Sequence, residues 1–322
     1  MDHRRQEENE APYRTVYRKI KTGTFRVLEF APLSASTNAS EDARPAALVM
    51  ILHGFPDLPE GWITQAKALQ KAGFFVVVPE QRGYGESEKP SGVESYQLDF
   101  LANDVFDLAT SYGARRFHLV GHDWGGIVAW WMACNAPDRI LRLAILNAPH
   151  PAVTRTYVLR HPRQLLQSSY VAFFQLPRIP EWLLSQKDFM ALRNSLLKSS
   201  RPGAFSEGEM KMYVQAWKRP QALTSMLNWY RALPLLSFKN RAVKVTSPTL
   251  ILWGDRDQFL QTGLAFESQK YCTESDLQIL PESTHWLHRE EALKINKELT
   301  QFFSREPFSP TAKRINQEIP LT

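Results

Sequence analysis

The chain alternates between short apolar runs, which are typical of buried strands, and longer segments with helical periodicity. The apolar runs are bounded by Gly, Pro or Asp and predict strands over residues 24–30, 47–52, 74–78, 117–120, 141–146, 249–253 and 277–280. Helical periodicity predicts helices over residues 63–71, 96–112, 126–135, 259–271 and 290–303. Strands that alternate with helices favour an α/β fold, in which helices flank a mostly parallel sheet.

One long segment interrupts this alternation. Residues 150–235 contain no persuasive strand, only helix-like stretches rich in Tyr, Trp, Phe and Pro. A segment inserted between two parallel strands is expected over the carboxyl ends of the sheet, where ligands bind in open α/β folds. The sequence therefore predicts three parts: the N-terminal part of an α/β core over residues 1–149, a helical cap over 150–235, and the C-terminal part of the core over 236–322.

Composition and charge are those of an ordinary globular protein. The 322 residues are 43% hydrophobic and 22% charged, which excludes a wholly disordered, collagenous or disulfide-stapled chain. The formal net charge is +6 and the pI is about 9.2, but no basic run is interleaved with aromatic residues. Scattered solvated charge is therefore the preferred interpretation, and nucleic acid is not expected as a partner.

The cellular location is inferred from two further features. The chain has only two cysteines, which fits a reducing compartment. We find no signal-peptide pattern and no apolar run long enough to cross a bilayer. A cytoplasmic location is therefore expected, whereas the oligomeric state cannot be predicted.

The sharpest chemical signal is the sequence FHLVGHDWGG at residues 117–126, which leads into a predicted helix. A strand, a small residue, an acid and a pair of small residues before a helix form the layout of a nucleophile elbow. Here the nucleophile position is Asp123, and a carboxylate can displace a leaving group at saturated carbon to form an alkyl ester. The alternative, that Asp123 only caps the helix, explains neither the three flanking glycines nor the strand.

A second motif can stabilise negative charge during hydrolysis of such an ester. HGFP at residues 53–56 follows a predicted strand, and the backbone amides of Phe55 and Trp124 can together form an oxyanion hole. These donors would face the oxygen that becomes negative when water attacks the ester carbonyl. The alternative interpretation of HGFP is an ordinary turn at the end of a strand.

Hydrolysis also requires a general base and an acid that orients it. His285 lies in the loop after the last predicted strand and is the expected base, whereas His288 is expected on a helix surface. Asp257 is favoured over Asp255 as the orienting acid, and nucleophile, acid and histidine then follow the chain order of α/β hydrolases. We find no tight cluster of metal-ligating residues, so neither a metal nor another cofactor is expected.

These segments resemble the epoxide hydrolase branch of the α/β-hydrolase family, and in particular the vertebrate epoxide hydrolase 3 and 4 group. The resemblance spans residues 13–303 and rests on HGFP (53–56), RGYGES (82–87), GHDWGG (121–126), NAPHP (147–151), LRHPRQLLQSSY (159–170), FFQLP (173–177), LNWYRA (227–232) and WGDRD (253–257). It implies hydrolysis of an epoxide by water to a vicinal diol. It also implies that Tyr170 and Tyr230 of the cap donate hydrogen bonds to the epoxide oxygen, where phenolic donors stabilise developing alkoxide charge.

The sequence departs from the family pattern around the predicted site. Glu80 stands where relatives usually carry an aspartate or a similar acid, and residues 57–63 replace a stretch rich in Trp and Arg. Val171 and Ala172 replace bulkier aromatic residues beside Tyr170, which is expected to widen the pocket. The aromatic and Leu-rich cap predicts a lipophilic substrate. The resemblance implies a lipid-like one, such as a fatty-acid epoxide.

Two alternative functions stay open at this point. A haloalkane dehalogenase also uses an Asp nucleophile, but it would need a second halide donor, often Asn, where this chain has Phe55. A catalytically silent hydrolase fold that only binds a ligand is the other alternative, because a fold does not fix a function. The presence of every expected catalytic residue favours an enzyme.

Overall fold

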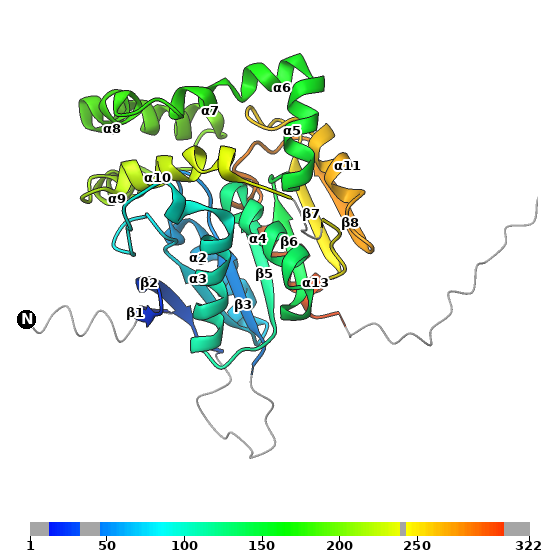
Figure 1. Ribbon diagram of the computed structural model, residues 1–322. Coiled ribbons are helices and arrows are strands. Elements are labelled where there is room, and N and C mark those ends of the chain that lie inside the picture. Colours follow the sequence, from blue (N-terminus) through cyan, green and yellow to red (C-terminus); the bar gives the residue numbers. More distant parts are fainter. Residues whose placement is uncertain (1–12, 33–45, 239–242, 306–322) are drawn as a thin grey trace, which may run out of the picture.

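The computed structural model describes residues 13–32, 46–238 and 243–305, which form one sheet covered by helices (Figure 1). The strand order in the eight-stranded sheet is β1-β2-β4-β3-β5-β6-β7-β8. Neighbouring strands from β4 to β8 are parallel, whereas β2 pairs antiparallel with both β1 and β4. The strands are β1 Arg14–Ile20, β2 Gly23–Phe30, β3 Leu48–Leu52, β4 Phe75–Pro79, β5 Phe117–His122, β6 Ile140–Leu146, β7 Thr249–Gly254 and β8 Ser275–Leu280. The predicted α/β fold with a mostly parallel sheet is confirmed.

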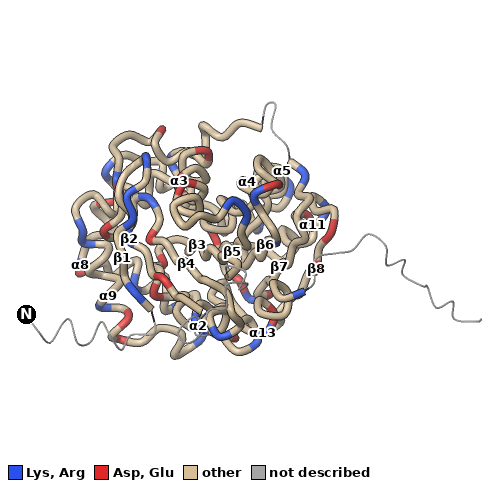
Figure 2. The backbone as a smooth tube through the Cα atoms, turned by 90° about the horizontal axis from the view of Figure 1, so that it is seen from below, with Lys and Arg blue, Asp and Glu red and all other residues tan. Residues whose placement is uncertain are grey.

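Helices bury both faces of the sheet, as Figure 2 shows from below. One face packs on α3, α4 and α11, and the other on α2, α12 and α13. The central strands are near-continuous apolar runs because neither face meets water. These helices are α2 Ile63–Lys71, α3 Leu98–Ser111, α4 Asp123–Asn135, α11 Gly263–Gln269, α12 Leu287–Glu290 and α13 Ala292–Phe303; the short 3-10 helices are η2 Pro59–Trp62, η3 Glu94–Tyr96 and η4 Pro137–Arg139.

The stretch between β6 and β7 is helical and lies over the carboxyl ends of the parallel strands (Figure 1). We call residues 151–235 the cap; the division into domains itself stays a prediction. Within it, α6, α7 and α8 form the layer farthest from the sheet. The helices of the cap are α5 Pro151–Arg160, α6 Pro162–Gln167, α7 Ser169–Phe174, α8 Ile179–Ser199, α9 Glu207–Trp217, α10 Ala222–Arg231 and the 3-10 helix η5 Leu233–Leu235.

Arg231, at the end of α10, connects three helices of the cap. Its guanidinium donates to the backbone carbonyls of Phe174 and Leu176, at and just beyond the end of α7. It also forms an ion pair with Glu181 of α8 at 2.7 Å. Because this pair is mostly buried, it is less screened than a surface ion pair.

Two elements differ from the sequence prediction. The strand β1 was not predicted, because its alternating sequence RTVYRKI lies on the sheet edge and leaves Arg14, Thr15, Tyr17 and Lys19 exposed. The helix expected over residues 259–271 begins only at Gly263, since the preceding residues form a loop around Asp257. No helix in the described part of the chain is both long and apolar enough to cross a bilayer.

Candidate active site

Asp123 stands at a sharp turn between β5 and α4. Its φ angle is +50°, in the left-handed region that few residues other than glycine adopt. The carboxylate is largely buried, with 14% of the side chain exposed. The turn therefore holds one strained acid at the carboxyl end of the central strand, as the elbow motif predicts.

Two glycines allow the end of β3 and the loop after it to lie close to this turn. A Cβ atom at Gly54 would lie 2.4 Å from Cβ of Asp123, and one at Gly125 would lie 2.3 Å from the carbonyl oxygen of Leu52. Both distances are far below van der Waals contact. A side chain at either position would therefore push β3 and the elbow apart.

The loop after β3 supplies backbone donors to the same carboxylate. The amide of Phe55 donates to Asp123 Oδ1 at 2.8 Å, and the amide of Trp124 also hydrogen-bonds this side chain. Both predicted oxyanion-hole residues are thus at the acid. Donors placed at a carboxylate oxygen can also stabilise negative charge on the carbonyl oxygen of an ester formed there.

His285 and Asp257 form the second part of the site. The Nδ1 atom of His285 lies 2.7 Å from Asp257 Oδ2, and its Nε2 atom lies 3.7 Å from Asp123 Oδ2. Asp255, by contrast, is exposed and accepts a hydrogen bond from Thr262. The structure thus brings Asp123, Asp257 and His285 together and leaves Asp255 at the surface.

Asn147 is a site residue that sequence reasoning did not assign a role. It directly follows β6 with a φ angle of +39°, and its side-chain amide donates to Asp257 Oδ2. Its carbonyl oxygen accepts from the amide of Gly254 at 2.8 Å. Asn147 therefore joins the ends of β6 and β7 and helps to hold Asp257. Only the NAPHP motif, quoted above for the family resemblance, indicated this position.

Burial and charge set the protonation of the central groups. Burial raises the pKa of Asp123, although the charge of His285 and the amides of Phe55 and Trp124 oppose that shift. Burial also acts to lower the pKa of His285. The charge and hydrogen bond of Asp257 outweigh it, so the pKa of His285 is raised above its usual value. The imidazole is therefore a stronger base than a free histidine.

Two tyrosines of the cap close the site from above. Tyr170 lies on α7 and Tyr230 on α10; their ring centroids are 5.9 Å apart and their hydroxyl groups are hydrogen-bonded. Burial, followed by nearby charges that include Asp123, raises the pKa of Tyr170. The pKa of Tyr230 is raised well above its usual value by burial and by Tyr170 and Asp123. Both phenols therefore keep their protons and can donate hydrogen bonds.

Comparisons with known proteins show the family to which the chain belongs. The profile of the family described as alpha/beta hydrolase fold matches residues 47–292. Epoxide hydrolase 4 of Mus musculus is 38% identical over 276 residues, which cover 83% of this chain and 75% of that protein. The chain belongs to the epoxide hydrolase branch of the α/β-hydrolase family.

Two further matches extend the comparison to bacterial proteins. The AB hydrolase superfamily protein YfhM of Bacillus subtilis is 40% identical over 259 residues, covering 80% of this chain and 91% of that protein. The solved structure of an epoxide hydrolase from Bacillus megaterium in complex with an inhibitor has a TM-score of 0.79 at 24% identity. It covers 90% of this chain and 100% of that chain and shows a shared fold.

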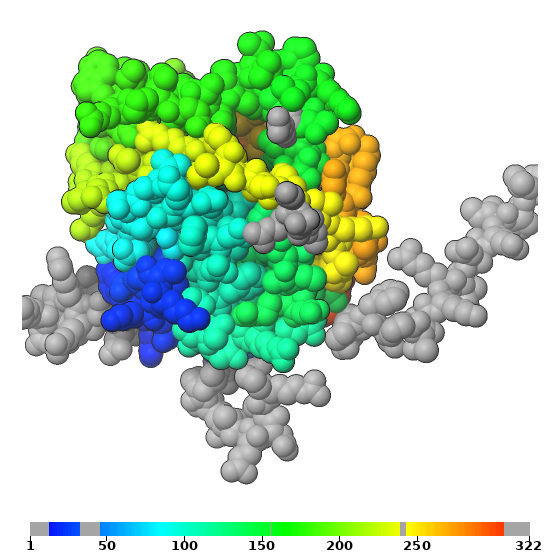
Figure 3. Space-filling view, in the orientation of Figure 1, coloured from blue at the N-terminus to red at the C-terminus, as the bar shows by residue number. Residues whose placement is uncertain are grey.

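A hollow lies on the face shown in Figure 3, between the green cap helices and the yellow segment after α10. A cavity of about 260 Å³ is lined by Trp124, Trp131 and Trp229, among others. Asp123 is not among the residues that line this cavity, whereas the next residue, Trp124, lines it and contacts the ring of Trp229 at 5.8 Å between centroids. The cavity lining thus combines aromatic side chains with polar and aliphatic ones, among them Asp99 and Leu233.

The expectation that His288 lies on a helix surface is wrong. His288 is 1% exposed, its ring stacks on Trp62 at 4.3 Å, and its Nε2 atom lies 3.5 Å from Asp57 Oδ2. Burial lowers its pKa, although Asp57 opposes the shift. The four-residue helix α12 packs on η2, a contact between distant segments that local sequence cannot reveal.

The expectation that the chain has no tight cluster of metal-ligating residues is also corrected, at the surroundings of His288. Potential ligand atoms of Asp57, His122 and His288 lie within 4.8 Å of one another in the described part of the chain. Asp57 also accepts from Tyr213 and lies 3.7 Å from the guanidinium of Arg289. That cation already supplies the positive charge that a buried carboxylate requires. We therefore interpret the cluster as a polar support beneath the site.

Glu80, a departure from the branch pattern, supports the neighbouring RGYGES loop. Its carboxylate accepts hydrogen bonds from the backbone amides of Glu86 and Ser87 and pairs with Arg26 at 3.5 Å. Burial raises its pKa, against the opposing charge of Arg26. Glutamate therefore has a structural role at this position and does not reach the reacting groups described above.

Proposed function

We propose that the protein hydrolyses epoxides to vicinal diols through an ester on Asp123. The observation that carries this proposal is the arrangement of one buried carboxylate between a histidine–aspartate pair and two phenols. Names of relatives such as epoxide hydrolase 4 support the same reaction class. The two phenols favour a substrate whose leaving group is an oxygen that becomes negative.

In the first step, a carboxylate oxygen of Asp123 attacks one carbon of the epoxide and the ring C–O bond breaks. The Tyr170 and Tyr230 hydroxyls donate to the ring oxygen, and one of them transfers its proton to the forming alkoxide. Because an alkoxide is a poor leaving group in water, this donation lowers the barrier. The product of this step is a hydroxyalkyl ester on Asp123.

In the second step, His285 removes a proton from a water molecule, which attacks Cγ of the ester. The amides of Phe55 and Trp124 stabilise the oxyanion, and Asp257 stabilises the imidazolium. Collapse releases the diol after the imidazolium returns its proton to the departing oxygen. The proton left on Asp123 restores the tyrosine phenol, so the net reaction consumes one epoxide and one water.

The substrate is proposed to be lipophilic. The side chains around the two tyrosines are aromatic, since Phe55, Phe174 and Trp124 each lie within 5.2 Å of the Tyr230 ring, measured between centroids. Apolar walls with few polar groups bind apolar chains and orient a single polar centre. Epoxides of long-chain or aryl compounds fit this description better than small polar epoxides.

A trapping experiment tests the two-step route. The His285→Gln variant is mixed with a lipophilic aryl epoxide, and its intact mass is measured over time. An increase by the mass of the epoxide, located on Asp123 by peptide mapping, is expected because the ester forms but is not hydrolysed. Absence of the adduct, or an adduct at another residue, would contradict the proposal.

Matched variants identify the acid and the nucleophile. Asp257→Asn is expected to accumulate the ester, whereas Asp255→Asn, in the same loop, should keep nearly full turnover. Asp123→Ala serves as the blank without diol formation.

In a single turnover in ¹⁸O-labelled water, the label should enter Asp123 and not the diol. Bromide release from a bromoalkane without diol formation from any epoxide would instead identify a dehalogenase.

A further inference from the structure

The outer layer of the cap exposes an unusual amount of apolar surface. Among the described residues, fourteen large apolar side chains are exposed, and ten of them lie in the cap, which is about a quarter of the chain. Leu166 is 75% exposed and Trp182 is 63% exposed. The members on α6 and α8 are Leu165, Leu166, Ile179, Trp182, Leu183 and Met190. Contiguous exposed apolar surface marks an interaction site.

The positive charge of the protein is concentrated in the same part. Residues 151–235 contain twelve Lys and Arg and four Asp and Glu, a formal net charge of +8, whereas the rest of the chain carries −2. Five exposed cations accompany the apolar residues of the outer layer and pair with no carboxylate of the described chain: Arg160, Arg163, Arg178, Lys187 and Lys198. The two acids of this layer, Glu181 and Asp188, are both paired with cap cations.

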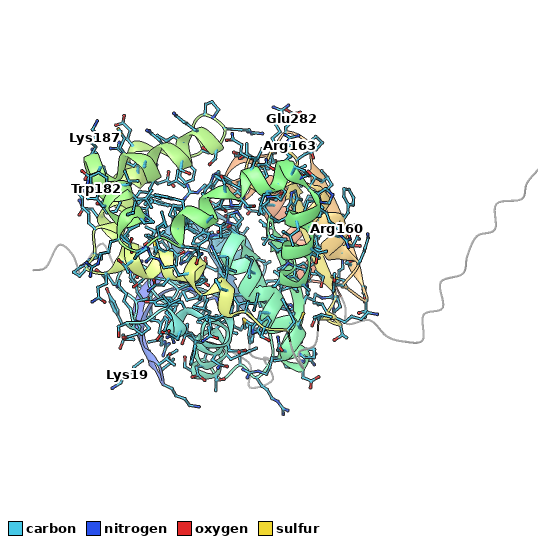
Figure 4. The ribbon with its side chains drawn as sticks, turned by 45° about the horizontal axis from the view of Figure 1, so that its top comes forward. Lys19, Arg160, Arg163, Trp182, Lys187 and Glu282 are labelled. Carbon is cyan, nitrogen blue, oxygen red and sulfur yellow. The ribbon has the colours of Figure 1, made fainter. Side chains whose placement is uncertain are left out.

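These exposed side chains belong to α6, to α8 and to residues beside them, including Arg160 at the end of α5. Figure 4 shows Arg160 and Arg163 at one end of the cap and Trp182 and Lys187 at the other. α8 consists of two helical segments, because residues 186–189 have non-helical backbone angles. Its first segment buries Leu184 and exposes Trp182, and its second buries Leu192 and Leu196 and exposes Met190. We call the six apolar residues and five cations named above the outer cap surface.

We propose that the outer cap surface binds the surface of an anionic lipid bilayer. Exposed Leu and Trp side chains can enter the headgroup region, where Trp is favoured, while Lys and Arg contact acidic headgroups. A second copy of this chain is disfavoured as the occupant, because two such faces would bring like charge together. Nucleic acid is disfavoured because most of the exposed side chains are aliphatic, and bases stack on aromatic rings.

The expected strength of binding to the bilayer follows from the number of cationic and apolar side chains in the outer cap surface. Each Lys or Arg at an anionic surface strengthens binding about fivefold, so removal of three should weaken binding about a hundredfold. Removal of three exposed apolar side chains should weaken binding by at least about tenfold. Raised salt should reduce binding further, since the attraction between surface charges is screened.

Binding is measured with the full chain by sedimentation with vesicles of phosphatidylcholine, alone or with one third phosphatidylserine. The charge variant combines Arg160→Gln, Arg163→Gln and Lys187→Gln. The apolar variant combines Leu165→Gln, Leu166→Gln and Trp182→Gln, whose side chains are at least half exposed. The matched control for charge combines Lys19→Gln, Lys294→Gln and Lys297→Gln, which are exposed and lie outside the cap. Circular dichroism checks that each variant is folded.

The proposal predicts salt-sensitive binding of the unaltered chain to the phosphatidylserine vesicles. Both cap variants should lose this binding, and the control should retain it. No binding by the unaltered chain, or equal binding by the charge variant and its control, would overturn it. A concentration-dependent dimer in ultracentrifugation that only the apolar variant abolishes would assign the surface to a second copy and also overturn it. The proposal does not rest on the epoxide reaction. Asp123→Ala should bind vesicles like the unaltered chain, so failure of one proposal leaves the other intact.

Discussion

Replacement of Asn147 by glycine should destabilise the protein and impair the second half of the reaction. Asn147 contributes two buried hydrogen bonds, one to the carboxylate of Asp257 and one from the amide of Gly254. A hydrogen bond to a charged group contributes about 1.5–3 kcal/mol, and an unsatisfied buried amide costs about 1–3 kcal/mol. The expected loss is therefore about 2.5–6 kcal/mol, a large part of the roughly 5–15 kcal/mol that stabilises a typical domain.

The backbone conformation allows the contribution of the side chain to be separated from that of strain. Because the φ angle of Asn147 is +39°, glycine adopts this conformation freely, whereas alanine is strained. Asn147→Ala should therefore be about 1 kcal/mol less stable than Asn147→Gly. Asn194→Ala, at an exposed position of α8, is the control and should change stability by less than about 0.5 kcal/mol.

The assay is urea unfolding followed by tryptophan fluorescence, with the free energy compared at an unchanged slope. A parallel rapid-mixing experiment separates ester formation from ester hydrolysis, and only hydrolysis should slow, because Asp257 acts on His285. If Asn147→Gly unfolds within about 0.5 kcal/mol of the unaltered protein, Asn147 does not hold Asp257 as described. Equal slowing of ester formation and ester hydrolysis would also contradict a role of Asn147 that acts through Asp257.

Three further predictions concern the donors, the base and the elbow. Tyr170→Phe and Tyr230→Phe should each slow ester formation about 10²–10³-fold with little loss of stability, measured by rapid mixing and thermal melting. Turnover measured against pH should fall as pH drops through the pKa of His285, which lies above the usual 6.5, because the protonated imidazole cannot accept a proton. Gly125→Ala should prevent folding or abolish activity, because its Cβ would meet the backbone of β3, whereas Gly208→Ala, with open space around it, should melt like the unaltered protein.

Each of these predictions has a clear contrary result. Ester formation within a few-fold of normal in both Tyr170→Phe and Tyr230→Phe would contradict the role of the two hydroxyl groups as donors to the alkoxide. Turnover that stays constant below the usual pKa of histidine would show that His285 is not the base. A folded, active Gly125→Ala protein would mean that β3 and the elbow can separate without cost.

The central sheet could be predicted from sequence because its strands are buried on both faces. Runs such as residues 75–78 are apolar without interruption, and helix α2 begins and ends where its periodicity predicts. The edge strand β1 could not be predicted, because exposed edge positions carry polar side chains. Its identity depends on pairing with β2, from Arg14 opposite Glu29 to Ile20 opposite Gly23.

The candidate site shows the same division between local and long-range information. Asp123 is marked by its own glycine-rich turn, so its place at the elbow could be predicted without a structure. Asn147 reaches Asp257 only because β6 and β7 are neighbours in the sheet, with Leu146 opposite Leu252. The surroundings of His288 likewise depend on the ring of Trp62, more than two hundred residues earlier. Contacts of this kind follow from strand order and have no local signature.

The bonds made by Arg231 have a mechanical consequence for the two phenols. The guanidinium fastens the end of α10, beside Tyr230, to the end of the helix that carries Tyr170 and to the outer helix α8. These bonds and the hydrogen bond between the two hydroxyl groups link the positions of the two phenols. A tilt of the joined helices would therefore move both hydroxyl groups together relative to Asp123 and keep the distance between them.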